Sequence, residues 1–203
     1  MLDKMFALYD KKVPEIRFKG FNENWEFKRI DNIFKEYSIK NNDIYPLLSI
    51  KQGIGTVLRS ESERSIKLDT GNVKTLKLVH EGDLIMHLRS FESGLERANH
   101  NGLVSPAYHI FKSESANTNV YYFYFRRKDF INYDLVNHIY GIRDGKSIDI
   151  DGFNSIIIPY TSIREQNKIS DLILDLEFLT KKYEQKLEKL NNIKQALLEK
   201  MFC

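Results

Sequence analysis

The stretch from Ile163 to Cys203 contains neither glycine nor proline, and it constrains the fold more than any other feature of the 203-residue chain. All 10 glycines and all 4 prolines precede it. Ser162 and Glu165 have the spacing of a capping box, which marks the start of a helix. The pattern predicts one helix from Ile163 to the end of the chain, about 60 Å long at 1.5 Å per residue. Its apolar residues recur in the helical steps of three and four, at Ile169, Leu172, Leu176, Leu179, Tyr183, Leu187, Leu190, Ile193, Leu197 and Met201.

So long a helix exceeds the width of the preceding globular part, and its narrow apolar stripe predicts packing against another long helix. The steps depart from a strict heptad, so the supercoil is expected to be irregular. A second copy of the chain supplies an identical helix, and a two-fold axis makes the two helices antiparallel. We therefore expect a homodimer whose contact residues are Leu172, Leu176, Leu179, Tyr183, Leu187, Leu190, Ile193 and Leu197.

The residues before position 160 have the pattern of a mixed domain. Short runs typical of strands are separated by turns that contain glycine, and they do not alternate with helices of regular length, which disfavours a doubly wound sheet. The aromatic segment 119–138 favours a helix over a strand pair. The predicted fold class is α+β, with a globular domain over residues 1–160 and a long helix of coiled-coil type over residues 161–203. The expected strands are Tyr45–Ile50, Lys74–Val79, Asp83–Leu88, Leu103–Phe111 and Ser155–Ile158.

Composition excludes several classes of protein. The single cysteine, Cys203, rules out an internal disulfide framework and a zinc site built from several cysteines of one chain. No window reaches the roughly 18–20 apolar residues of a membrane span, and the N-terminus has no pattern of a signal peptide. Both observations favour a cytoplasmic protein. The net charge of +3 neither indicates nor excludes a nucleic-acid partner.

Sequence signatures of catalysis are missing. There is no phosphate-binding P-loop and no nucleophile elbow, and Gly53 and Gly55 form a lone GxG without the third glycine of a dinucleotide site. The five histidines are scattered and form no metal-binding pair. We therefore expect a binding module rather than an enzyme, with no catalytic residues, no metal and no cofactor.

Two groups of polar residues are candidates for contacts with DNA. Arg126, Arg127 and Lys128 follow an aromatic run and could neutralise phosphates; equally, they could be cations that stabilise the C-terminus of a helix. The second group flanks an apolar strand and a polar loop, where arginine can pair with guanine and asparagine with adenine. The alternative for this group is a surface loop without a partner. Its members are Arg89, Ser90, Arg97, Asn99 and His100.

Several motifs, in order along nearly the whole chain, resemble one half of the specificity subunit of a type I restriction-modification system. The first part carries Val13-Pro14-Glu15-Ile16-Arg17-Phe18, Gly20-Phe21 and Trp25-Glu26. The middle carries Gly82-Asp83-Leu84-Ile85, Leu88-Arg89-Ser90-Phe91 and Val104-Ser105-Pro106-Ala107-Tyr108. The junction and the end carry Phe153, Ile156-Ile157-Ile158-Pro159, Glu165-Gln166, Lys168-Ile169 and Lys194-Gln195-Ala196-Leu197-Leu198-Glu199-Lys200-Met201-Phe202.

This resemblance implies a target recognition domain followed by a conserved spacer helix. A full subunit of that family has two such units, reads a bipartite DNA sequence, and directs adenine-methyltransferase subunits and a restriction subunit that cleaves DNA. The resemblance between residues 2–6 and 198–202 fits a tandem repeat of which this chain is one unit. Because the family's catalytic residues lie on other chains, none is transferred here.

Two alternatives remain at this point. The chain could be the recognition fragment of a single-chain restriction enzyme-methyltransferase, which a fused catalytic module upstream in the gene would reveal. It could also be a coiled-coil adaptor that does not bind DNA. The sequence does not give the DNA target or the methyltransferase partner.

Overall fold

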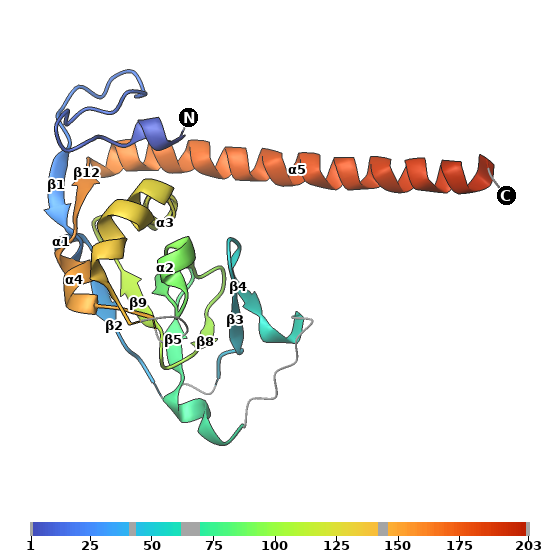
Figure 1. Cartoon of the computed structure of the whole chain (residues 1–203), viewed down its shortest axis with the longest axis horizontal. Helices are drawn as coiled ribbons and strands as arrows, with labels where there is room; N and C mark the ends of the chain where they lie inside the picture. Colours follow the sequence, from blue (N-terminus) through green and yellow to red (C-terminus); the bar gives the residue numbers. More distant parts are fainter. Residues whose placement is uncertain (1, 41–43, 62–69, 142–145, 202–203) are drawn as a thin grey trace.

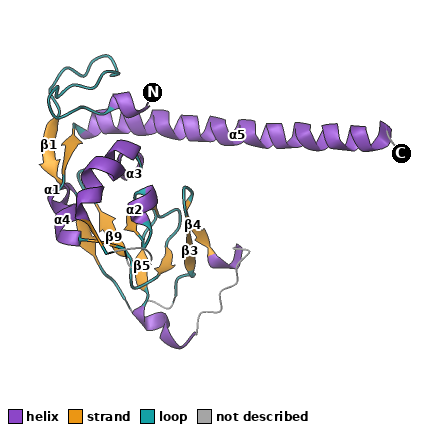
Figure 2. Ribbon diagram, viewed as in Figure 1, coloured by secondary structure: helices purple, strands orange, loops and turns teal. Residues whose placement is uncertain are grey.

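The computed structural model describes residues 2–40, 44–61, 70–141 and 146–201. They form a mixed domain of short strands and short helices, from which one long helix, α5 (Ile163–Met201), projects (Figure 1). The predicted α+β class and the long C-terminal helix are confirmed. Figure 2 shows the pair β1–β12 beside the start of α5, with helix α3 between α5 and the strands β3, β4, β5 and β9.

Within the described residues, four strands form one antiparallel sheet, and the others form four antiparallel two-stranded sheets. The larger sheet has the order β2-β9-β6-β7, and the pairs are β1-β12, β3-β4, β5-β8 and β10-β11. The bounds are β1 Glu26–Arg29, β2 Lys35–Tyr37, β3 Leu48–Lys51, β4 Gly55–Leu58, β5 Lys77–Val79, β6 Leu84–Met86, β7 Glu96–Arg97, β8 Gly102–Val104, β9 His109–Lys112, β10 Ile139–Tyr140, β11 Ser147–Ile148 and β12 Ile157–Tyr160.

Each of the five predicted strands overlaps an observed one, with one correction. The expected strand Leu103–Phe111 is two strands, β8 and β9, which belong to different sheets. Pro106 lies in the turn between them, where Tyr108 N–H donates to the Ser105 carbonyl at 3.2 Å. Since proline has no N–H for a strand ladder, the apolar run is interrupted there.

The helices before α5 are short: α1 Ile30–Ile33, α2 Ser90–Ser93, α3 Thr118–Phe125 and α4 Ile150–Ser155. The remaining turns are 3₁₀ helices at Leu2–Met5, Arg59–Glu61, Thr70–Thr75 and Leu135–His138, and a π-helix at Phe130–Asp134. The helical interpretation of segment 119–138 is confirmed, but the segment forms three pieces. Asn117 caps the first piece by accepting from Asn119 N–H at 3.1 Å.

Aromatic side chains dominate the largest core. Phe34, Tyr121, Phe125, Phe130 and Phe153 are almost fully buried, with Phe125 and Phe130 ring centroids 5.1 Å apart. The N-terminal segment enters the same core through buried residues at positions 5 and 6. By contrast, residues 198–201 of the similar C-terminal segment lie on the exposed end of α5, and position 202 is outside the described residues. The two similar segments therefore have different surroundings.

Only the first turns of α5 pack on the domain. Ile169 and Ile173 are 2% and 1% exposed, whereas residues 178–201 are all exposed. About 24 residues thus project, roughly 36 Å of helix at 1.5 Å per residue. Positions 202 and 203 of the predicted helix lie outside the described residues.

The start of α5 departs from the predicted capping box. Ser162 Oγ does accept from Glu165 N–H, at 3.4 Å. The carboxylate of Glu165, however, accepts two hydrogen bonds from Arg17, at 2.7 and 2.9 Å, and one from the Thr161 hydroxyl at 2.5 Å. Gln166 also bonds the domain, because its Oε1 accepts from Asn117 N–H at 2.8 Å. These contacts fix the helix to the domain. No helix in the described ranges is both long enough and apolar enough to cross a membrane.

Candidate functional site

Arg97 connects three elements of the fold. Its Nη1 donates to Asn119 Oδ1 at 2.8 Å, on α3, and its Nη2 lies 3.6 Å from Glu177 Oε2, on α5. The guanidinium also lies 5.0 Å from the ring centroid of Tyr122. With its side chain only 19% exposed, Arg97 holds β7, α3 and α5 together.

Asn99 is likewise engaged within the protein. Its amide Nδ2 donates to the carbonyls of Ile54 at 2.7 Å and Thr56 at 3.1 Å. Its backbone N–H donates to Thr56 Oγ1 at 2.8 Å, and its Oδ1 accepts from Arg97 Nε at 3.4 Å. The structure thus brings Arg97 and Asn99 together, behind the β3–β4 hairpin.

Of the other residues of this predicted group, Arg89 and Ser90 lie at the start of α2, and His100 directly follows Asn99 in the chain. Arg89 is exposed and pairs with Glu92 at 2.7 Å. His100 is exposed beside Asn99. Ser90 has no exposed surface, and its hydroxyl accepts from His87 N–H at 2.9 Å, so its role is in the turn that begins α2. The side chain of Ser90 is therefore not available at the surface for a contact with DNA.

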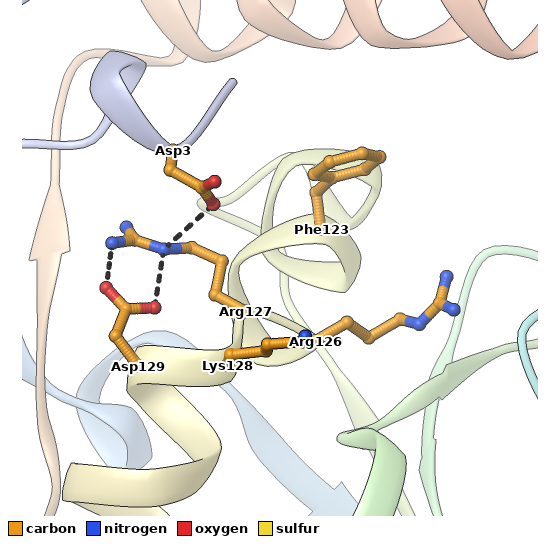
Figure 3. A pocket seen from close by; sticks show the side chains of 6 residues that line it. All are labelled: Asp3, Phe123, Arg126, Arg127, Lys128 and Asp129. Atoms are coloured by element: carbon orange, nitrogen blue, oxygen red, sulfur yellow. Dashed lines mark hydrogen bonds and ion pairs between the residues drawn. The ribbon is translucent and has the colours of Figure 1, made fainter. Parts of the chain in front are cut away.

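The three consecutive cations after α3 do not form one surface cluster. Figure 3 shows Arg126 and Arg127 extending in opposite directions around a pocket of about 590 Å³. Arg127 pairs with Asp129 and lies 3.5 Å from Asp3, and its side chain is only 8% exposed. Lys128 is exposed. Because α3 ends at Phe125, all three cations follow a helix C-terminus, where positive charge is favourable.

Arg126 instead belongs to a cluster beneath the hairpin. Its Nη1 donates to the Tyr122 hydroxyl at 2.7 Å, and that hydroxyl lies 3.5 Å from Glu96 Oε2. Glu96 is fully buried, and burial raises the pKa of its carboxyl. Burial also raises the pKa of Tyr122 to about 12. The second oxygen of Glu96 accepts from Gly53 N–H at 2.8 Å, so the cluster ends at the backbone of the hairpin.

Sequence analysis missed the element that this cluster supports. Residues 52–54 connect β3 to β4, and they and Lys51, the last residue of β3, are all exposed. Gly53 and Gly55, which match no dinucleotide site, both have positive φ angles, +82° and +98°. Glycine tolerates such angles without strain, which is why it is common in hairpin turns. Two glycines just after the predicted strand Tyr45–Ile50 were the available signal for this hairpin.

The described part of the chain contains no group of three His, Cys, Asp or Glu residues that could hold a metal ion. Around the supported hairpin lie Arg97, Asn99 and Arg126, each of which donates a hydrogen bond within the protein, and the carboxyl groups of Glu96 and Glu177.

Comparison with solved structures identifies the fold. A crystal structure of the HsdS subunit from Thermoanaerobacter tengcongensis matches 91% of this chain at a TM-score of 0.51 and 10% sequence identity. The chain has an HsdS-like fold. A second match, from a study of complex assembly and conformational transition in the type I R-M system, has 15% identity, 90% coverage and a TM-score of 0.49.

The chain spans 43% and 47% of those two proteins, less than half of each. No family model matches the sequence, and no curated protein matches it either. The comparison therefore concerns the fold.

Proposed function

We propose that this chain is a DNA-recognition subunit of a type I restriction-modification system. The observation that carries the proposal is the HsdS-like fold. The match covers 91% of the chain. Because residues 1–162 alone are a smaller share of the chain than this, the match also includes part of α5. In this proposal the chain has no catalytic residues, metal or cofactor of its own. It directs partner methyltransferase and restriction subunits to a bipartite target in double-stranded DNA.

Within this function, residues 1–160 are the target recognition domain and residues 161–203 the spacer and dimerisation helix. The apolar stripe of α5 supports a homodimer. Leu179, Tyr183, Leu187 and Leu190 are 44–65% exposed, and the stripe continues through Ile193 and Leu197 at 56% and 57%. Leu172 and Leu176 are partly buried at its start. An apolar stripe of this length left in water favours association.

We propose a second copy of this chain as the partner for the stripe. It supplies an identical apolar stripe, and a two-fold axis makes the two helices antiparallel. Acidic and basic residues occur in both halves of α5, so the apolar stripe rather than the charge pattern supports this pairing.

A two-fold dimer places two identical recognition domains at opposite ends of a helical pair. Identical domains related by a two-fold axis must read inverted half-sites. The proposed target is therefore an interrupted palindrome.

Fluorescence anisotropy with labelled duplex DNA tests the binding. Affinity should fall steeply between about 50 and 200 mM salt, because neutralised phosphates release counterions. Binding that is absent, or independent of salt, would contradict DNA recognition and favour a coiled-coil adaptor. A catalytic module fused upstream in the gene would instead favour a single-chain restriction enzyme-methyltransferase.

Sedimentation equilibrium at micromolar concentration tests the dimer. We expect about twice the chain mass of 24.0 kDa. Leu187→Glu with Leu190→Glu should give a monomer, whereas Asn192→Glu, exposed off the stripe, should not. A wild-type monomer would overturn the dimer.

A further inference from the structure

We propose that the tip of the β3–β4 hairpin, residues 51–54, reads base edges of the DNA target. The inference rests on the proposed function and names the element that performs it. Lys51, Gln52, Gly53 and Ile54 are all exposed, and the apolar side chain of Ile54 is 50% exposed. One exposed apolar side chain close in sequence to an amide and an ammonium group is a composition suited to base edges, which present donors, acceptors and the thymine methyl group.

The hairpin tip is held from behind by buried groups. Glu96 accepts from Gly53 N–H at 2.8 Å, and Asn99 donates to the Ile54 carbonyl at 2.7 Å. Both bonds bind the backbone of the tip, so they fix its shape and leave its side chains free. A recognition loop fixed in advance loses less conformational entropy on binding.

Close backbone packing provides further support. A Cβ atom on Gly55 would lie 2.3 Å from the carbonyl oxygen of Arg97, so β4 lies directly against the chain of β7. A Cβ atom on Gly53 would lie 3.3 Å from Arg126 Nη2, so the Arg126 side chain lies against the backbone of the tip. Arg97, Asn99 and Arg126 are therefore positioning residues, and the reading side chains are those of the hairpin tip.

The geometry and chemistry of the tip fit the major groove. A two-stranded β-ribbon is among the elements that this groove admits. The Gln52 amide has the donor and acceptor that pair with adenine, Ile54 can contact a thymine methyl group, and Lys51 can pair with guanine or a phosphate. The hairpin lies on the concave side of the molecule, beneath α5 (Figure 1). There Gly53 and Ile54 line one pocket of about 700 Å³ together with residues of α5, which include Leu176, Glu177, Thr180 and Lys181.

The test compares DNA consensus sequences selected from a randomised duplex library by the full-length chain and its variants. Gln52→Ala should still bind DNA with an unchanged salt dependence. It should lose its preference at one or two positions of each half-site, by about 5- to 150-fold in relative affinity. Ile54→Ala should alter a neighbouring position. Gln185→Ala, the same change on the exposed part of α5, is the matched control and should select the wild-type consensus.

If both hairpin variants select the wild-type consensus unchanged, this inference is overturned and the proposed function still stands. If the wild-type chain binds DNA but selects no consensus, sequence recognition itself fails, and the inference fails with it. Since residues 52 and 54 are exposed turn positions, neither substitution removes a core contact.

Discussion

Replacing Arg17 with alanine tests how the helix is attached to the domain. The change leaves the carboxylate of Glu165 without its cation, although that side chain is only 2% exposed. Its remaining side-chain donor is the Thr161 hydroxyl, at 2.5 Å. Removing one partner of a buried pair typically costs about 3–5 kcal/mol, because the other charge stays buried without compensation.

Equilibrium unfolding in urea measures this cost. The midpoint should fall while the m-value stays constant, which identifies a change in stability rather than in compactness. For a chain of this size, about 3–5 kcal/mol corresponds to roughly 6–20 °C in Tm. Arg164→Ala, one step away on the exposed face of α5, is the control and should change the unfolding free energy by less than about 0.5 kcal/mol.

A double replacement separates the cost of leaving one buried charge unpaired from the contribution of the Arg17–Glu165 ion pair itself. Arg17→Met combined with Glu165→Met should recover much of the lost stability, because no charge is then left buried. If Arg17→Ala costs no more than the Arg164→Ala control, the ion pair does not fix the helix, and the account of the domain-helix junction is wrong.

The remaining predictions concern the hairpin support and the helix. Burial raises the pKa of the Glu96 carboxyl above its ordinary value of 4.5; the native chain therefore keeps that proton to a higher pH than the unfolded chain, and stability falls as pH rises through the window above 4.5. Glu96→Gln should make this fall above pH 4.5 shallower, and an unchanged pH profile of urea unfolding would refute this. Gly55→Ala should destabilise by more than about 1 kcal/mol, and by more than Gly20→Ala, which has a similar φ of +93° but open space around it; equal costs would deny the close packing of β4 on β7. Ile173→Ala truncates a side chain that is 1% exposed and should lower the free energy of unfolding by about 2–5 kcal/mol. Leu187→Ala, measured at a concentration where the chain is monomeric, is the control. If Ile173→Ala costs no more than this control, α5 does not pack on the domain at Ile173.

Sequence patterns that continue over many residues predicted the architecture well. The absence of glycine and proline after position 162, together with the three-four apolar spacing, was enough to predict α5 almost to the residue, because helical periodicity is a local property. The α+β class followed from short strands without regular helices between them. The very short strands β7, β10 and β11, of two residues each, left no comparable pattern.

The candidate site was predicted less well, because its contacts depend on tertiary packing. Arg97 and Asn99 were chosen for what their side chains can read, yet their donors are used by Asn119, Ile54 and Thr56. Three adjacent cations suggested one cluster. At the end of α3, however, the side chains of Arg126 and Arg127 point in opposite directions, and Arg127 pairs with Asp129. Residue type indicates which bonds a side chain can make; only the fold decides which partner is within reach.

The most direct test of the central claim is the DNA sequence that the unmodified chain selects from a randomised duplex library. We predict enrichment of an interrupted palindrome, which is two inverted half-sites with a spacer of constant length, and binding that weakens steeply with salt. A pool that stays random after selection, whatever the salt concentration, would contradict the claim that this chain recognises DNA.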